Sequence, residues 1–410
     1  MQLFEAGSFI QLPLDLGTIR TGCLSEIFSD LLLSSNGTVL LSFVSICLLF
    51  AWRMFIDDSE DHENFVETLK QEELDKKWKR HNEKWGTSTP SPKLNIEVAM
   101  PLPEGSVRLI PTEPFPTMVT IIGDLSSART VLITYHDIGM NHRWCFSRLL
   151  HCMHSAGMLD GGVAVVNVDA PGHEDGAAAL PGVEMASGLN LESCATQLQT
   201  VVNALGISVP LVGMGIGAGA NVLLRFTCDC PSKMAGLILM NPSLGYPSRC
   251  ERVSLSLVRS LMSPFAMVGS SVSTMARIHF SQRALACKSL PRSYARCYRQ
   301  PVEWRNKQWF IDAFRSRDTI GPTSRLEALK AVPMLCFSAC ESAGADFISN
   351  DYTEEDCAAL VMELRMEVAH TRLSHMRIKG CGAQLAEERA EEILQPIKLF
   401  TQGIGLNFGR

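Results

Sequence analysis

Short runs of apolar residues recur along the chain beyond residue 93, and helical patterns separate the later runs. The runs span residues 94–100, 106–110, 118–122, 130–139, 162–172, 209–215, 234–243 and 332–340. Continuous apolar runs of this length are typical of parallel strands that are buried on both faces. Residues 190–205, 218–228 and 351–369 show helical spacing. This alternation predicts an α/β fold with a mostly parallel sheet, flanking helices and right-handed crossovers.

The strand pattern stops between residues 243 and 325, where the sequence becomes helical and rich in arginine. An insertion after one strand, followed by a return to the sheet, is typical of a helical cap over the strand ends. We therefore expect a body in two parts, residues 94–242 and 326–406, with a basic helical cap at 243–325.

The N-terminal region contains a long apolar segment. Residues 31–52 contain no charged side chain, and about 20 such residues suffice to cross a bilayer. The pattern predicts a transmembrane helix at 31–56, after an N-terminal flank at 1–30 and before a helical stalk and linker at 57–93. Acidic residues in the flank argue against a cleaved signal peptide, and a buried core helix is the alternative. Basic residues after the span favour a cytoplasmic C-terminal domain.

Composition and charge narrow the function classes. A net charge of −6 with a pI near 6.0 gives no indication of nucleic-acid binding. The fourteen cysteines are scattered, without a CxxC pair or a Cys/His cluster, so we expect reduced thiols and no metal site. Reduced thiols also agree with a cytoplasmic location.

The stretch PLVGMGIGAGANVLLRF, residues 210–226, predicts a buried strand, a glycine-rich turn and a helix. Gly213, Gly215 and Ala218 satisfy the dinucleotide pattern GxGxx[GA]. That pattern belongs to the first strand–helix–strand unit of its domain and needs an acidic residue at the end of the next strand. Here several strands come earlier and the next strand ends in Met240-Asn241-Pro242. We therefore expect no cofactor.

The same stretch also fits the turn of an α/β-hydrolase that carries the nucleophile. In that frame, GxSxG, the glycines Gly213 and Gly217 flank Gly215, which takes the place of the nucleophile. Glycine has no side chain with which to attack an ester.

The other positions of a hydrolase site follow in the expected order. His136 and Asp137 stand where hydrolases keep the oxyanion loop, and Glu341 ends the strand after the cap, where a catalytic acid would lie. The slot expected for the catalytic histidine holds Ala383, and no histidine follows His375. Acyl transfer needs both a nucleophile and a base. The sequence thus predicts a hydrolase-like protein with no catalytic residues and no small-molecule substrate.

An unconventional active site is the alternative. His136, Asp137, His173 and Ser243 are all expected near the cleft below the cap. Two histidines and a carboxylate there would allow hydrolase or lyase chemistry. Their structural interpretation is that His136 and Asp137 hold a loop by hydrogen bonds.

Six stretches of this chain resemble the N-myc downstream-regulated (NDRG) family. They are ITYHDIGMN (133–141), VNVDAPGHEDGA (166–177), GMGIGAGANVLLRF (213–226), GLILMNPS (236–243), HFSQRAL (279–285) and LFTQGIG (399–405). The resemblance covers roughly residues 94–406. It implies an α/β-hydrolase fold with a small helical cap and no hydrolase activity. It further implies action through binding partners in differentiation, stress signalling or membrane and vesicle trafficking, with some contact with lipids.

The cap carries most of the positive charge. Residues 243–325 hold fourteen basic and four acidic residues. Such a patch would suit an anionic partner, either lipid headgroups or an acidic protein. The alternative is a solvated face with its arginines paired to acids. The candidate patch is Arg292, Arg296, Arg299, Arg305, Lys307, Arg315 and Arg317.

Three functions follow from these patterns. The leading one is a membrane-tethered, non-catalytic adaptor that acts through protein partners and anionic lipid. The second is a hydrolase or lyase with an unconventional site. The third is a soluble lipid- or protein-binding module whose apolar N-terminal segment packs into the body.

Overall fold

The computed structural model of the chain describes residues 105–181, 188–243, 245–247, 249–261, 279–285, 302–321, 323–339, 351–366, 370–406 and 408. The expected membrane span at 31–56, the stalk at 57–93 and the strand at 94–100 lie outside these ranges. Within them, no helix is long and apolar enough to cross a bilayer.

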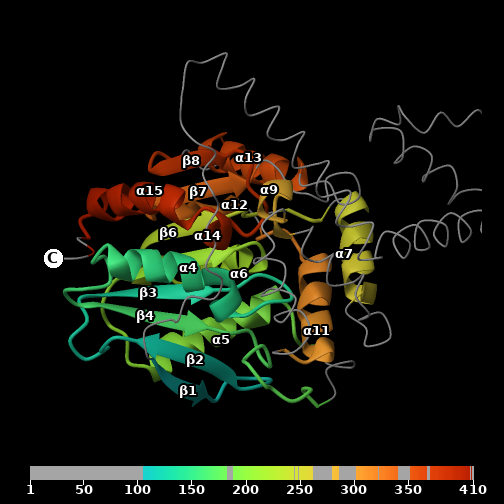
Figure 1. The fold of residues 1–410 in the computed structure, drawn as a ribbon, viewed down its shortest axis with the longest axis horizontal. Helices are drawn as coiled ribbons and strands as arrows, with labels where there is room; N and C mark the ends of the chain where they lie inside the picture. The colour runs from blue at the N-terminus through green and yellow to red at the C-terminus, as the bar shows by residue number, and fades with distance from the viewer. Residues whose placement is uncertain are drawn as a thin grey trace, which may run out of the picture. The chain divides into compact units, whose positions relative to one another are not determined.

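Eight strands form one sheet in the order β1-β2-β4-β3-β5-β6-β7-β8 (Figure 1). Their bounds are β1 Ser106–Ile110, β2 Thr117–Ile122, β3 Thr130–Tyr135, β4 Val163–Val168, β5 Leu211–Ile216, β6 Met234–Met240, β7 Met334–Ala339 and β8 Leu373–Ile378. All neighbours from β4 to β8 pair in parallel, whereas β2 runs antiparallel to both β1 and β4. The predicted mostly parallel α/β sheet is confirmed.

The central strands are buried along their whole length. Every residue of β3, β4, β5 and β7 is buried. This explains why these strands appear in the sequence as continuous apolar runs. β1 differs because it lies at the edge of the sheet, and Val107 and Leu109 are exposed there.

Helices cover the sheet on its two faces (Figure 1). Their bounds are α4 His142–Ser155, α5 Leu191–Ala204, α6 Ala218–Asp229, α12 Thr323–Leu326, α13 Asp351–Met366, α14 Leu385–Glu388 and α15 Ala390–Gly403, with 3-10 turns at Pro231–Lys233 and Glu327–Ala331. α4 packs with α14 and α15, and α5 packs with α6. The helices expected at 190–205, 218–228 and 351–369 correspond to α5, α6 and α13.

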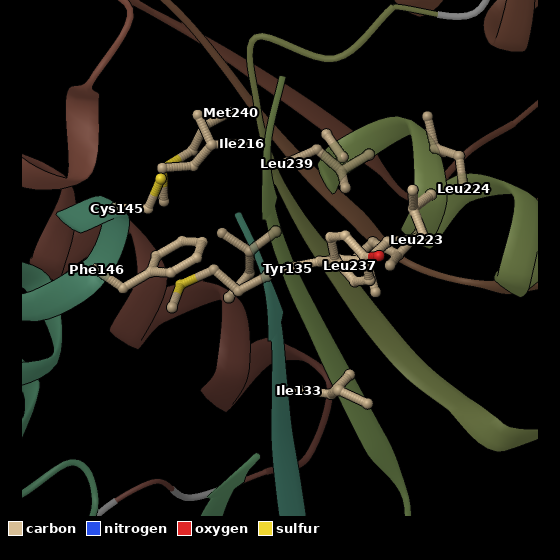
Figure 2. Close-up of a cluster of buried hydrophobic side chains, with 14 of the residues drawn as sticks. Ile133, Tyr135, Cys145, Phe146, Ile216, Leu223, Leu224, Leu237, Leu239 and Met240 are labelled. Atoms are coloured by element: carbon tan, nitrogen blue, oxygen red, sulfur yellow. The ribbon is translucent and has the colours of Figure 1, made fainter. Parts of the chain in front are cut away.

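The core lies between these helices and the central strands. Figure 2 shows Tyr135 of β3, Phe146 of α4, Ile216 of β5 and Met240 of β6 among its members. Their burial removes large apolar surfaces from water, which stabilises the fold by about 25 cal/mol for each Å² of apolar surface buried. The cysteines whose side chains the structure describes are all free thiols, and all but Cys152 are buried.

The described part of the region expected to form the cap consists of helices joined by turns and loops. It contains α7 Arg249–Leu261, α9 Gln282–Leu285 and α11 Trp304–Arg315. α7 packs against α11. Both lie at the end of the sheet where the parallel strands finish (Figure 1). In α/β folds this is the edge at which ligands bind.

Candidate functional site: a closed hydrolase-like turn

The sharp turn after β5 is centred on Gly217. Gly217 has φ 51° and ψ −112°, and α6 begins at the next residue. Gly215 instead lies within β5, where it pairs with Tyr135 of β3 and Leu239 of β6. The left-handed residue of a nucleophile turn is the nucleophile itself, so Gly217 takes that place.

The turn therefore lies two residues later than the frame centred on Gly215 predicts. Glycines at every second position satisfy the GxSxG frame in two registers, and only the backbone angles distinguish them. The observed frame is Gly215-Ile216-Gly217-Ala218-Gly219. Gly213 lies further back in the strand, with the Leu237 side chain against it. The nucleophile position still holds a glycine.

Asp137 occupies the space beside the turn. Its Oδ1 accepts hydrogen bonds from the backbone N–H of Ile138 at 2.8 Å and of Ala218 at 3.0 Å. In an α/β-hydrolase the oxyanion is held by the N–H that follows the nucleophile and by an N–H from the loop after β3. Ala218 and Ile138 provide these two groups here. A carboxylate of the chain itself thus fills the oxyanion position.

The same carboxylate excludes any side chain at the turn. A Cβ on Gly217 would lie 2.6 Å from Asp137 Cγ and would overlap Oδ1. Asp137 and a nucleophile at position 217 are therefore sterically incompatible in this backbone arrangement.

Burial raises the pKa of the Asp137 carboxyl to about 6, against the opposing effect of the two N–H groups that donate to it. Desolvation disfavours the ionised form more than the two hydrogen bonds favour it. The group therefore titrates close to neutral pH.

His136 has both ring nitrogens engaged. Nδ1 donates to the Asp137 carbonyl oxygen at 2.7 Å, and Nε2 accepts from the Ala170 N–H at 2.9 Å. Burial lowers the pKa of His136, and the N–H of Ala170 requires an unprotonated Nε2. His136 therefore fixes the loop after β3 against the loop after β4, and it has no nitrogen left to act as a base.

Aromatic side chains from the cap close the site from above. The Phe310 ring lies 5.3 Å from that of His173, 5.5 Å from that of His136 and 6.3 Å from that of Tyr135. Trp309 Nε1 donates to the Pro171 carbonyl at 3.3 Å. Helix α11 thus covers the loops around the turn with packed rings.

His173 is buried within this ring cluster. Its Nδ1 contacts the Pro171 carbonyl at 3.2 Å, and its Nε2 has no hydrogen-bond partner among the described residues. Burial lowers the pKa of His173 to about 3, with His136 contributing in the same direction. His173 is thus neutral over the whole physiological range.

A buried asparagine of α11 adds polar contacts to this cover. Asn306 Nδ2 donates to the carbonyl oxygens of Gly172 and Ala178, both at 2.9 Å, and its Oδ1 accepts from the N–H of Leu180 at 3.0 Å. All three contacts lie in the loop after β4. The cap is therefore joined to the body by directed hydrogen bonds as well as by packed rings.

Ala383 lies in the loop after β8. Its carbonyl accepts from Asn241 Nδ2 at 3.0 Å, which ties this loop to the end of β6. His375 lies within β8, and its Nε2 is 2.9 Å from Ser338 Oγ on the neighbouring β7. Ser243 is buried directly after β6. Glu341 falls outside the described residues.

The structure describes four residues of the predicted basic patch, of which it buries two and exposes Arg305. Lys307 and Arg317 are buried, and Arg317 pairs with Glu251 at 2.8 Å. Arg315 pairs with Asp312 at 3.0 Å, and Arg305 lies over the Trp304 ring. A long basic side chain can point into the protein where an acidic side chain or a backbone carbonyl accepts its hydrogen bonds. A count of charges along the sequence does not reveal this. The remaining three, Arg292, Arg296 and Arg299, lie outside the described residues.

One buried pair near the site was not predicted from the sequence. Asp169, directly after β4, accepts from His142 Nδ1 at 2.7 Å and from the His142 backbone N–H at 2.8 Å. An acidic residue at the carboxyl end of a predicted strand was the available signal. The described residues contain no group of three or more His, Cys, Asp or Glu side chains that could hold a metal ion.

Comparison with known proteins gives two kinds of similarity. The sequence model of the Ndr family matches residues 115–407. Protein NDRG1-A of Xenopus laevis is 27% identical over 294 residues, covering 70% of this chain and 68% of that protein. Protein NDL1 of Arabidopsis thaliana is 29% identical over 296 residues, covering 70% and 78%.

Solved structures with the same fold include two esterases. A carboxylesterase from Nitrososphaera gargenis superposes with a TM-score of 0.55 at 13% identity, over 73% of this chain and 99% of that one. A thermophilic esterase from Thermogutta terrifontis gives 0.53 at 16% identity, over the same shares. At these identities the likeness establishes the α/β-hydrolase fold alone.

Proposed function

Since this chain belongs to the Ndr family, we propose that it is a non-catalytic member of the α/β-hydrolase fold that works as a binding adaptor in signalling or trafficking. The observation that carries the proposal is the Asp137 carboxylate on the N–H groups of Ile138 and Ala218. A hydrolase must keep these donors for the charge that develops on the substrate.

Three further requirements of acyl transfer point the same way. Position 217 has no side chain, His136 has no nitrogen available, and Phe310 packs over the loops that a substrate would have to reach. Each loss alone would slow an esterase severely, and an enzyme needs all of these parts in one place.

Hydrolysis is tested with the full chain and a panel of p-nitrophenyl esters and thioesters of different acyl length. We expect no turnover above that of a heat-denatured sample, while an active esterase of the same fold serves as a positive control. Saturable turnover that is lost in H136A, D137N or H173F, but kept in the strand variant H375A, would establish an unconventional active site instead.

The tether is the second part of the proposal. We place the anchor at residues 31–56, on the basis of its length and lack of charge. Extraction of cell membranes with alkaline carbonate distinguishes the alternatives, since an integral protein stays in the pellet. Release of the full chain, to the same extent as a chain lacking residues 1–56, would contradict the anchor.

An adaptor must also have partners. We expect the detergent-solubilised full chain to sediment from cell extracts in complexes larger than itself, and cross-linking to retain those complexes. Sedimentation as a single free chain under both conditions would contradict the adaptor role.

A further inference from the structure

Helix α6, which begins at the turn, carries two polar side chains that are almost completely buried. Asn221 and Arg225 are four residues apart and therefore lie on one face of the helix. Arg225 is 4% exposed and Asn221 is fully buried. Burial of a guanidinium is costly unless its donors are satisfied, so its contacts indicate what it holds in place.

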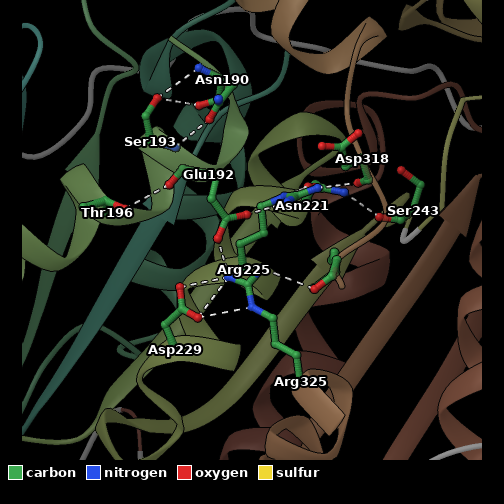
Figure 3. Close-up of polar contacts among 11 residues, drawn as sticks. Asn190, Glu192, Ser193, Thr196, Asn221, Arg225, Asp229, Ser243, Asp318 and Arg325 are labelled. Atoms are coloured by element: carbon green, nitrogen blue, oxygen red, sulfur yellow. Dashed lines mark hydrogen bonds and ion pairs between the residues drawn. The ribbon is translucent and has the colours of Figure 1, made fainter. Parts of the chain in front are cut away.

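Asn221 contacts the chain where it leaves the sheet for the cap. Its Nδ2 donates to the Ser243 carbonyl oxygen at 2.8 Å, and its Oδ1 accepts from Arg225 Nε at 2.8 Å (Figure 3). One amide thus joins the start of the cap to the buried guanidinium.

Arg225 contacts the chain where it returns from the cap. Its Nη2 donates to the Asp318 carbonyl oxygen at 2.5 Å, three residues after α11 ends at Arg315. Its Nη1 pairs with Glu192 of α5 at 2.5 Å (Figure 3). The same guanidinium therefore connects the end of the cap with both α5 and α6.

A second arginine strengthens the returning side. Arg325 pairs with Glu192 and, at 2.9 Å, with Asp229 at the end of α6 (Figure 3). Glu192 lies between two guanidinium groups, and they lower its pKa against the effect of burial. Its carboxylate thus remains ionised and keeps both arginines in place.

The two helices of the cap are joined to each other as well. Arg259 of α7 pairs with Asp312 of α11 at 2.7 Å, and Arg317 pairs with Glu251 of α7 at 2.8 Å. A movement that releases one end of the cap would therefore also strain the contacts of the other.

We propose that Asn221 and Arg225 form a latch that holds both ends of the cap on α6 and keeps the cap closed over the turn at Gly217. Lids of active enzymes open on hinge residues near their ends. Here both ends are bound to one buried pair on a single helix. The latch acts whether or not the turn beneath it performs any chemistry.

The latch is tested by hydrogen–deuterium exchange of the full chain. Asn221→Ala removes the contact at the first end, and Glu192→Gln weakens the ion pairs at the second without emptying the site. We expect backbone amides of both α7 and α11 to exchange about tenfold faster in each variant, the size expected for loss of one buried hydrogen bond. Amides of β3 and β4 should keep their wild-type rates.

Glu391→Gln is the matched control. It removes an ion pair of similar length, Arg148–Glu391 at 2.7 Å, that joins α15 to α4 in the body. This variant should leave exchange in α7 and α11 unchanged. Wild-type exchange in the cap of N221A and E192Q, or equal acceleration in the cap and in β3 and β4, would overturn the latch.

Discussion

Asp137 does in this chain what a bound product would do in an esterase. Its carboxylate accepts hydrogen bonds from the N–H groups of Ile138 and Ala218, and it occupies the space that a side chain on Gly217 would need. The glycine and the aspartate therefore depend on each other. The filled oxyanion position and the need for glycine at 217 both arise because the loop after β3 lies against the start of α6.

This dependence predicts a non-additive pair of substitutions. G217S should lower the free energy of unfolding by about 1–3 kcal/mol through its left-handed backbone, and further through overlap with Asp137. In a D137A background the overlap is gone, so the cost of G217S should fall by about 1–3 kcal/mol. Urea denaturation of the four proteins measures the coupling. Additive effects would show that the two side chains do not meet.

The raised pKa of Asp137 predicts a pH effect of definite sign. Its folded pKa of about 6 exceeds the ordinary value of 3.8, so the folded chain binds the extra proton between these pH values. Stability from this group is therefore lost as pH rises through about 6.

D137N keeps the Oδ1 acceptor and cannot ionise. We expect it to be more stable than wild type by about 1–3 kcal/mol at pH 7.5, with the difference shrinking at pH 5. Urea midpoints at both pH values measure this. A pH-independent difference would contradict a titrating Asp137.

At the scale of elements, the glycines of β5 and α6 allow the helix to approach the sheet. A Cβ on Gly215 would lie 2.7 Å from the backbone nitrogen of Ala220, and a Cβ on Gly219 would overlap the carbonyl of Tyr135. Neither contact involves a flexible side chain. The backbone angles of Gly215 and Gly219 would allow other residues, but the close packing of α6 against the sheet requires glycine at both positions.

G219A should therefore be among the most damaging single substitutions, with a loss of about 3–5 kcal/mol or failure to fold. Gly403, in the last turn of α15, has open space around its Cβ position. G403A should be neutral or stabilising by up to about 1 kcal/mol. Soluble yield and thermal midpoints compare the two, and equal effects would disprove the packing argument.

At the scale of the whole molecule, the closed cap buries histidines as neutral groups. Burial lowers the pKa of His173 to about 3 and that of His279 to about 4. The unfolded chain binds protons at these positions below about pH 6.5, whereas the folded chain does not. Stability from both is complete above pH 6.5 and is lost as pH falls.

We expect each of the two histidines to lower the free energy of unfolding by about 2 kcal/mol between pH 7 and pH 5. Asp137 offsets part of this loss, because its contribution to stability increases as pH falls. H173F removes one of them and suits the surrounding rings. The variant should lose less stability than wild type over this range, measured by urea midpoints. An unchanged loss would mean that His173 is accessible to protons in the folded state.

The sequence was most informative where burial imposes one residue type. β3, β4, β5 and β7 are buried on both faces, and their apolar runs predicted them. β8 was not among the predicted strands, because exposed polar residues interrupt it. Helix α15 was also missed, since Pro396 lies inside it and breaks the helical pattern.

The sequence alone determined the fold class, the order of the central buried strands, a glycine at the nucleophile position and the absence of a histidine after His375. These depend on side-chain type and on order along the chain, which a sequence states directly. Only the tertiary structure decided that Gly217 is at the turn, that Asp137 fills the oxyanion position and that Lys307 is buried. Each of these depends on a backbone angle or on a contact between segments distant in sequence. Neighbouring residues in the sequence do not determine such angles and contacts, because these form only when distant segments of the chain pack together.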